Sequence, residues 1–230
     1  MISGSRPRLG GELERFDGAE RILHWANAVL VGVLLATGLI LYLGELSSLV
    51  GRRNLVRDIH VAAGLALPIP LLLTLPGRRG RGLRRDLSAL NRFSPDDWRW
   101  LRSRGRATGV RLGKFNPGQK LNAAFVAGAG VVLLATGCVM RFFGPFPLEW
   151  RTGATFVHDW TALALGLAVV GHVYLAMADP ESLNSMLTGR VPRWWALRQR
   201  PRWYEELTGE PAESEAAPRE AAEGTRAPGP

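Results

Sequence analysis

The chain has 230 residues, with 29 Lys and Arg against 20 Asp and Glu, and a formal net charge of +9. In a soluble protein such a charge would suggest a nucleic-acid partner, but 24 of the positive residues lie in residues 1–21, in residues 77–120 and after residue 178. Only five lie in the two other connections, which is the positive-inside asymmetry of a membrane protein. We therefore predict no nucleic-acid partner and place both termini and the 77–120 loop in the cytoplasm. The single cysteine, Cys138, excludes an internal disulfide.

Four long apolar runs follow one another along the chain, each bounded by charged residues. Each has about 19–23 residues, enough for a helix to cross the ~30 Å hydrocarbon core. Strand alternation is absent, and membrane barrels need many short alternating segments. The sequence therefore predicts an all-α integral membrane protein, a four-transmembrane-helix bundle with spans at 22–44, 59–77, 121–140 and 160–178.

The first polar segments are short. Residues 1–20 form a cytoplasmic N-terminal arm, and residues 45–58 form a brief outer connection. The second span contains Pro68 and Pro70, which remove two backbone donors and should kink it toward its cytoplasmic end. We expect residues 21–198 to form one membrane domain.

The long cytoplasmic loop between the second and third spans contains a helix signal. Ser94 is a candidate N-cap, followed by a proline in the first turn and by Asp96 and Asp97 at the positive helix end. The run Trp98-Arg99-Trp100-Leu101-Arg102 suits a short amphipathic helix on the membrane surface.

Two further features follow the fourth span. Trp194 and Trp195 predict a segment at the membrane interface, because indole rings favour that environment. Residues 199–230 are dominated, from about Glu205, by Glu, Ala, Pro and Gly, which predicts a disordered cytoplasmic tail.

All four histidines of the chain lie in or at the mouth of the apolar runs: His24, His60, His158 and His172. Ionisable side chains at membrane depth are rare and usually functional, because hydrocarbon cannot solvate them. Imidazole is the usual axial ligand of haem iron. Four such residues, with none in the polar loops, predict two bis-histidine haems.

Antiparallel spans allow the depth of each histidine to be estimated. His60 lies two residues inside the outer end of the second span, and His158 lies just outside that of the fourth. His24 lies near the inner end of the first span, and His172 about 9 Å from the inner end of the fourth. We pair His60 with His158 and His24 with His172, although the estimated membrane depth of His24 is smaller than that of His172. The 14 residues between His158 and His172 bring both onto one helix face, about 21 Å apart.

Each histidine also has a simpler interpretation. His24 and His158 could contact lipid headgroups, and His60 could begin a helix. A zinc or copper site competes with haem, but the two pairs are too far apart to form one site. Asp58 and Asp159 either accept hydrogen bonds from the outer imidazoles or mark helix N-termini.

Four segments share motifs with a known family. They are Arg21-Ile-Leu-His24-Trp25-Ala-Asn27 with Ala36-Thr37-Gly38-Leu39, Phe115-Asn116-Pro117-Gly118-Gln119-Lys120-Leu121, Gly171-His172-Val173-Tyr174, and Met186-Leu187-Thr188-Gly189-Arg190. These segments resemble the cytochrome b (gamma) subunit of respiratory formate dehydrogenase, within a wider dihaem cytochrome b family that includes hydrogenase cytochrome b subunits. The resemblance covers roughly residues 14–198.

The resemblance implies two haem b groups held by the same histidine pairs, the outer pair on the periplasmic side and the inner pair on the cytoplasmic side. It also implies a menaquinone or ubiquinone pocket near Asn116, Gly118 and His172. A quinone carbonyl needs hydrogen-bond donors, which Asn116 and the free amides at a helix start provide. Pro117 departs from the family pattern and removes one such amide.

The resemblance further implies an electron-transfer subunit in a bacterial inner membrane. Electrons would arrive from an iron–sulfur beta subunit and reduce quinone at the cytoplasmic side, while formate is oxidised on a molybdenum or tungsten alpha subunit. The complex could itself form a homo-oligomer. The alternatives are a cytochrome b subunit of a hydrogenase or another periplasmic oxidoreductase, and a membrane anchor without haem.

Overall fold

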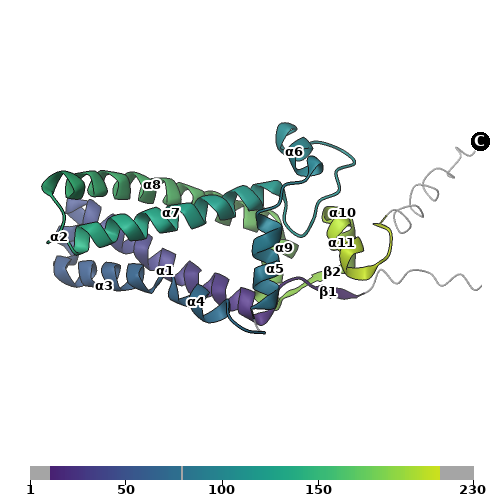
Figure 1. The fold of residues 1–230 in the computed structure, drawn as a ribbon, viewed down its shortest axis with the longest axis horizontal. Helices are drawn as coiled ribbons and strands as arrows, with labels where there is room; N and C mark the ends of the chain where they lie inside the picture. Colours follow the sequence, from purple (N-terminus) through teal and green to yellow (C-terminus); the bar gives the residue numbers. More distant parts are fainter. Residues whose placement is uncertain (1–10, 79, 213–230) are drawn as a thin grey trace, which may run out of the picture.

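The computed structural model describes residues 11–78 and 80–212, and it confirms the predicted all-helical membrane bundle (Figure 1). Four helical segments are long and apolar enough to cross a membrane. They are α1 (Gly18–Tyr42), α3 (Arg53–Ala66) continued by α4 (Ile69–Thr74), α7 (Pro117–Arg141) and α8 (Leu148–Ala178).

The spans associate as two pairs. Helix α1 packs along α3, and α7 packs along α8, while α3 and α7 join the pairs. Few residues of the spans are buried by protein: in α1 only Glu20 and Thr37, and in α8 only Ala154 and Leu165. Most apolar side chains of the spans are therefore left to contact lipid or a group held between the helices.

Local capping explains where the first and third spans begin. The Asp17 carboxylate accepts a hydrogen bond from the Glu20 amide at 2.9 Å, and the Glu20 carboxylate accepts one from the Asp17 amide at 2.8 Å. Asn116 and Gln119 form the same reciprocal capping box at the start of α7. Both helices therefore begin four residues before the predicted spans, at Gly18 and Pro117.

At the outer ends the helices extend further beyond the predicted spans. Helix α8 begins at Leu148, twelve residues before the predicted start, so that its 31 residues span about 46 Å. The second span begins at Arg53 rather than at residue 59. Asp58 and Asp159 bound the apolar runs in the sequence, but a helix continues through charged residues whose side chains reach water. The predicted outer connection is itself partly helical, as α2 (Gly44–Val50).

The expected effect of Pro68 is confirmed. Helix α3 ends at Ala66, and α4 starts at Ile69 with Pro70 in its first turn, where the missing amide is tolerated. The second span is therefore two helices in sequence.

The polar segments collect at the end of the bundle opposite α2 (Figure 1). There the 77–120 loop forms α5 (Arg81–Leu90) and α6 (Pro95–Arg102). The helix predicted after Ser94 is confirmed, with Ser94 and Asp97 in a capping box. The start of α1 and the segment after α8 lie at this same end, as four antiparallel spans require.

Two short strands tie the N-terminal arm to the chain after the fourth span. Strand β1 (Glu12–Glu14) pairs antiparallel with β2 (Arg190–Pro192), and Leu13 lies opposite Val191. Helices α9 (Pro180–Thr188), α10 (Arg193–Gln199) and α11 (Pro201–Thr208) flank this ribbon. The sequence did not predict the ribbon, since three-residue strands carry no readable alternation.

A buried cluster after the ribbon corrects two predictions. Trp195 is only 2% exposed and packs with Trp203 and Tyr204, so it is a core residue and not an interfacial one, whereas Trp194 is 42% exposed. The same packing orders α11, which lies inside the predicted disordered tail. The remainder of that tail, residues 213–230, and residues 1–10 of the arm lie outside the described residues.

Candidate functional site

The inner histidine pair joins the first and fourth spans. His24 of α1 and His172 of α8 have ring centres 6.2 Å apart, with the ring planes at 59°. Each lies six residues from the helix end, counted from Gly18 and from Ala178. The depth mismatch estimated from the sequence therefore disappears, because α1 starts four residues before the apolar run.

Contacts with α9 hold the inner end of α1. The Trp25 indole donates to the Met186 carbonyl oxygen at 2.9 Å, and its ring meets the His24 ring edge-on. The Arg21 guanidinium donates to the Leu187 carbonyl oxygen. Residues 21–27 and 186–190, two of the segments that carry the family resemblance, are thus in direct contact. Their contacts fix the turn of α1 on which His24 lies.

The outer histidine pair joins the second and fourth spans. His60 of α3 and His158 of α8 also have ring centres 6.2 Å apart, with the ring planes at 63°. Contrary to the expectation from their depth, both lie well inside their helices, seven residues after Arg53 and ten after Leu148.

Threonine hydroxyls, and not the predicted carboxylates, contact the outer imidazoles. Nδ1 of His60 lies 2.8 Å from the Thr37 hydroxyl, and Nδ1 of His158 lies 2.9 Å from the Thr136 hydroxyl. Asp58 is instead paired with its neighbour Arg57 at 3.4 Å in an exposed position. Asp58 and Asp159 both lie inside helices, so neither marks a helix N-terminus either.

Both pairs fit a single metal atom between two imidazoles. Imidazoles that share a metal through bonds of about 2 Å have ring centres roughly 6 Å apart, and each pair has this separation. Among the described residues no group of three or more His, Cys, Asp or Glu could hold a metal ion, so a three- or four-residue zinc or copper site is not formed there. Two protein ligands for each metal suit a macrocycle that supplies the other ligands.

Helix α8 supplies one histidine to each pair. The 14 residues between His158 and His172 correspond to about 21 Å along the helix, which separates the two sites across the membrane. The partners come from α1 and α3, and α7 supplies no histidine. The helix pair α1–α3 thus faces α8 at two depths.

Asn116 and Gly118, the predicted quinone residues, lie at the start of α7. The Asn116 side-chain oxygen accepts a hydrogen bond from the Gln119 amide at 2.8 Å, so this oxygen is used as a helix cap. A Cβ added to Gly118 would meet the Asn116 oxygen at 3.3 Å and the Trp100 ring at 3.6 Å. Gly118 is thus packed beneath α6, and the quinone role of both residues stays a prediction.

Two buried ion pairs anchor the loop next to Asn116. Lys120 donates to Asp97 at 2.7 Å and to the Arg92 carbonyl oxygen at 2.6 Å, and both side chains of the pair are at most 3% exposed. Burial alone would raise the pKa of Asp97, but hydrogen bonds from Lys120 and Ser94 outweigh it and hold that pKa below its usual value. Lys114 pairs with Asp86 at 2.5 Å. The sequence did not reveal these pairs, because the loop is rich in charge throughout.

Arg15 closes the same end of the bundle. Its guanidinium donates to the Ser182 and Ser185 hydroxyls at 2.9 and 3.2 Å and lies over the Trp195 ring. Burial and the nearby Arg200 guanidinium lower the pKa of Arg15 to about 9, so it remains a cation at neutral pH. It links the N-terminal arm to α9 and α10.

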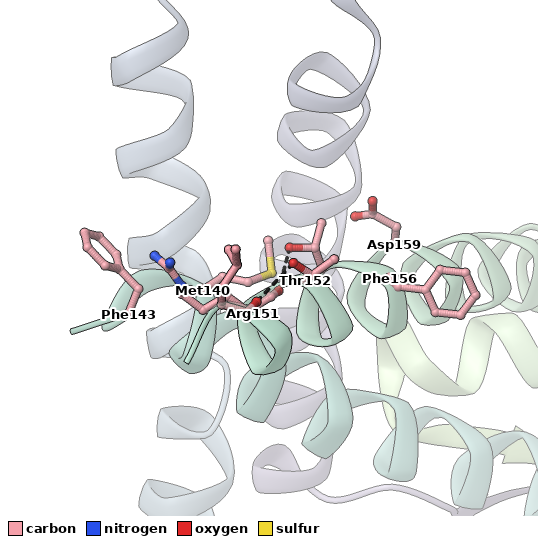
Figure 2. A pocket seen from close by; sticks show the side chains of 8 residues that line it. Met140, Phe143, Arg151, Thr152, Phe156 and Asp159 are labelled. Carbon is pink, nitrogen blue, oxygen red and sulfur yellow. Dashed lines mark hydrogen bonds between the residues drawn. The ribbon is translucent and has the colours of Figure 1, made fainter. Parts of the chain in front are cut away.

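A hollow lies at the opposite end of the bundle, where α7 turns into α8. Figure 2 shows its lining, with Phe143 and Arg151 on one side and Phe156 and Asp159 on the other. Its volume is about 630 Å³, and it is wide open. No histidine lines it, so it is not the site formed by either pair.

Comparison with known proteins agrees with this geometry. Residues 15–189 match the family model described as prokaryotic cytochrome b561. The cytochrome b556(Fdn) subunit of the nitrate-inducible formate dehydrogenase of Escherichia coli K12 is 26% identical over 210 residues, covering 85% of this chain and 92% of that protein. The formate dehydrogenase cytochrome b556 subunit of Haemophilus influenzae is 26% identical, covering 81% and 79%. A probable Ni/Fe-hydrogenase 1 B-type cytochrome subunit of E. coli K12 is 25% identical, covering 76% and 88%.

Proposed function

The chain belongs to the prokaryotic cytochrome b561 family, and from that premise we propose that it is the membrane cytochrome b subunit of a formate dehydrogenase-type complex. The observation that carries the proposal is the pair of histidine sites, each with ring centres 6.2 Å apart. Relatives that are formate dehydrogenase subunits cover 85% and 81% of this chain, which favours this complex.

The four histidines would hold two haem b groups, His60 and His158 on the periplasmic side and His24 and His172 on the cytoplasmic side. When bound, haem supplies one-electron redox chemistry that no side chain of this protein provides. The chain's own contribution is to hold the two sites on one helix, about 21 Å apart along its axis. The apolar spans exclude water from the space between them.

Quinone would bind at the inner end, near Asn116, Gly118 and His172. Because the Asn116 oxygen caps α7, the group left to a quinone carbonyl is its side-chain NH₂, a donor. The buried Lys120–Asp97 pair fixes the first turn of α7 from which this NH₂ projects. Menaquinone and ubiquinone both carry the two carbonyls that such a donor requires.

We propose that electrons flow from the periplasmic side to the cytoplasmic side. Electrons would be accepted on the periplasmic side from an iron–sulfur beta subunit, whose own donor is a molybdenum or tungsten alpha subunit that oxidises formate. Protons for the quinone would come from the cytoplasm. Moving one negative charge inward against a membrane potential of 100 mV stores about 2.3 kcal/mol, so the complex would conserve energy without a proton channel.

A hydrogenase cytochrome b subunit is the second candidate, favoured by the similarity to a hydrogenase B-type cytochrome. The two candidates share the haem sites and differ in the partner docked on the outer face. Purification of the tagged chain from its native membrane separates them, because formate or hydrogen, but not both, would reduce the copurified complex.

The proposal is tested by a dithionite-reduced minus oxidised spectrum of the purified chain, with haem counted by pyridine haemochrome. We expect two low-spin b haems per chain. His24→Ala should remove the inner haem and His60→Ala the outer one, leaving one haem in each variant. A haem-free chain from cells that make and insert haem would refute the proposal and favour a membrane anchor.

A further inference from the structure

The two threonines that contact the outer histidines belong to a repeated segment. Val33-Leu34-Leu35-Ala36-Thr37-Gly38 in α1 is identical to Val132-Leu133-Leu134-Ala135-Thr136-Gly137 in α7. In each copy the threonine contacts a histidine on the helix packed beside it, His60 on α3 and His158 on α8.

The glycine that follows each threonine meets the same histidine. A Cβ added to Gly38 would lie 3.4 Å from Cε1 of His60, and a Cβ added to Gly137 would lie 3.4 Å from Cε1 of His158. Two helix pairs at separate places in the chain thus hold an imidazole in the same way, with a hydroxyl at Nδ1 and a bare backbone at Cε1.

Each threonine hydroxyl has a second partner that decides the direction of the first contact. The Thr37 oxygen lies 2.6 Å from the Val33 carbonyl oxygen, and the Thr136 oxygen lies 2.7 Å from the Val132 carbonyl oxygen. A carbonyl oxygen can only accept, and a hydroxyl has one hydrogen to donate. The hydroxyl therefore donates to its own helix, which leaves its lone pairs to accept a hydrogen bond from the imidazole.

We propose that Thr37 and Thr136 are a matched pair of positioning residues that hold both outer imidazoles as the Nδ1–H tautomer, with the Nε2 lone pair free to bind iron. This inference rests on the proposed haem role of His60 and His158. A hydrogen bond accepted from Nδ1–H makes Nε2 more basic and fixes the ring orientation. The more basic ligand favours the oxidised iron and so lowers the reduction potential of the outer haem.

The inner pair differs and supplies an internal reference. Within residues 11–78 and 80–212 no hydroxyl or carboxylate is hydrogen-bonded to His24 or to His172. Changing the two threonines should therefore affect one haem and leave the other as it was.

The test is a redox titration of the purified chain with the variants Thr37→Val and Thr136→Val, which keep the side-chain shape and remove the hydroxyl. We expect each to shift the reduction equilibrium of the same haem about tenfold toward the reduced form, which is 59 mV upward for a one-electron couple. The double variant should shift that haem about a hundredfold, and the other haem should keep its potential.

Two controls separate positioning from general loss of structure. Thr37→Ser and Thr136→Ser retain the hydroxyl and should keep the wild-type potential. Thr74→Val removes a hydroxyl that likewise bonds the carbonyl oxygen four residues back, at 2.6 Å from Pro70, but contacts no histidine, and it should shift neither haem.

The outcomes are distinct. Loss of the outer haem alone in a valine variant, with the serine variant normal, also supports the inference. Unshifted potentials with both haems bound, equal shifts in the serine or Thr74 variants, or shifts of different haems by the two valine variants would overturn it. A wild-type chain without haem would instead refute the proposed function.

Discussion

Replacing Lys120 by methionine tests whether the buried ion pair at the start of α7 stabilises the protein. Methionine matches the length of the lysine stem but leaves the Asp97 carboxylate, which is fully buried, without its cation. Removing one member of a buried pair typically costs about 3–5 kcal/mol. The Ser94 amide and hydroxyl still donate to the same Asp97 oxygen at 2.7 and 3.0 Å, so we expect the lower end, about 3 kcal/mol.

The size of this effect is best measured as a double-mutant cycle. Asp97→Asn removes the negative charge, so the double variant carries no unpaired buried charge and should be more stable than Lys120→Met alone. Unfolding in mixed micelles of increasing denaturing detergent, followed by tryptophan fluorescence, gives the four free energies. If the two single costs simply add in the double variant, the ion pair does not couple these residues and the reasoning is wrong.

Three further predictions address acid stability, the quinone site and the packing of His158 against Gly137. The pKa of Asp97 is held below its usual value, so its stabilising contribution is present above that usual value and is lost as the pH falls through the lowered pKa. Lys120→Met leaves the buried carboxylate without its cation, which raises the pKa of Asp97 in the variant. The difference in unfolding free energy between wild type and Lys120→Met should therefore be largest near neutral pH and shrink as the pH falls, and a difference that persists below pH about 4 would contradict the assignment. Asn116→Ala should slow quinone reduction with both haems retained and also cost about 1 kcal/mol of stability through the lost cap. Asn116→Asp keeps a capping oxygen and replaces the NH₂ donor with a negatively charged acceptor, so it should slow quinone reduction without the loss of stability. An unchanged quinone KM in the aspartate variant would remove Asn116 from the site. Gly137→Leu should displace the His158 ring and lower the haem count from two to one per chain, while Gly153→Leu, at a position with open space, should keep both haems. Retention of two haems by the Gly137 variant would show that the close approach of His158 to the α7 backbone is unimportant.

The histidine pairing could be predicted because it depends on helix order and rise, which the apolar runs make readable. His24 and His172 match in depth once the first span is known to begin at Gly18. The apolar run does not show this helix start, because the first turn and capping residues such as Asp17 are polar. The outer helix ends cannot be read from the apolar runs, because Asp58 and Asp159 bound those runs but lie inside longer helices.

The second partners of the outer imidazoles could not be read from local pattern. A threonine in a membrane helix usually bonds its own backbone, and Thr37 and Thr136 do so as well. The signal that could have found them was the identical six-residue segment in the first and third spans. Trp195 was misjudged because the same indole ring serves at an interface and in a core, and only the packing of Trp203 and Tyr204 decides between them.

Helix α8 makes the number of residues between its two histidines a structural constraint in its own right. One residue inserted between His158 and His172 would turn the inner imidazole by about 100° away from His24 while leaving the outer pair intact. Seven inserted residues would restore the face to within about 20° but move the inner imidazole by about 10 Å along the axis, past the depth of α1's histidine. Substitutions along this stretch are therefore tolerated far more readily than any change in its length.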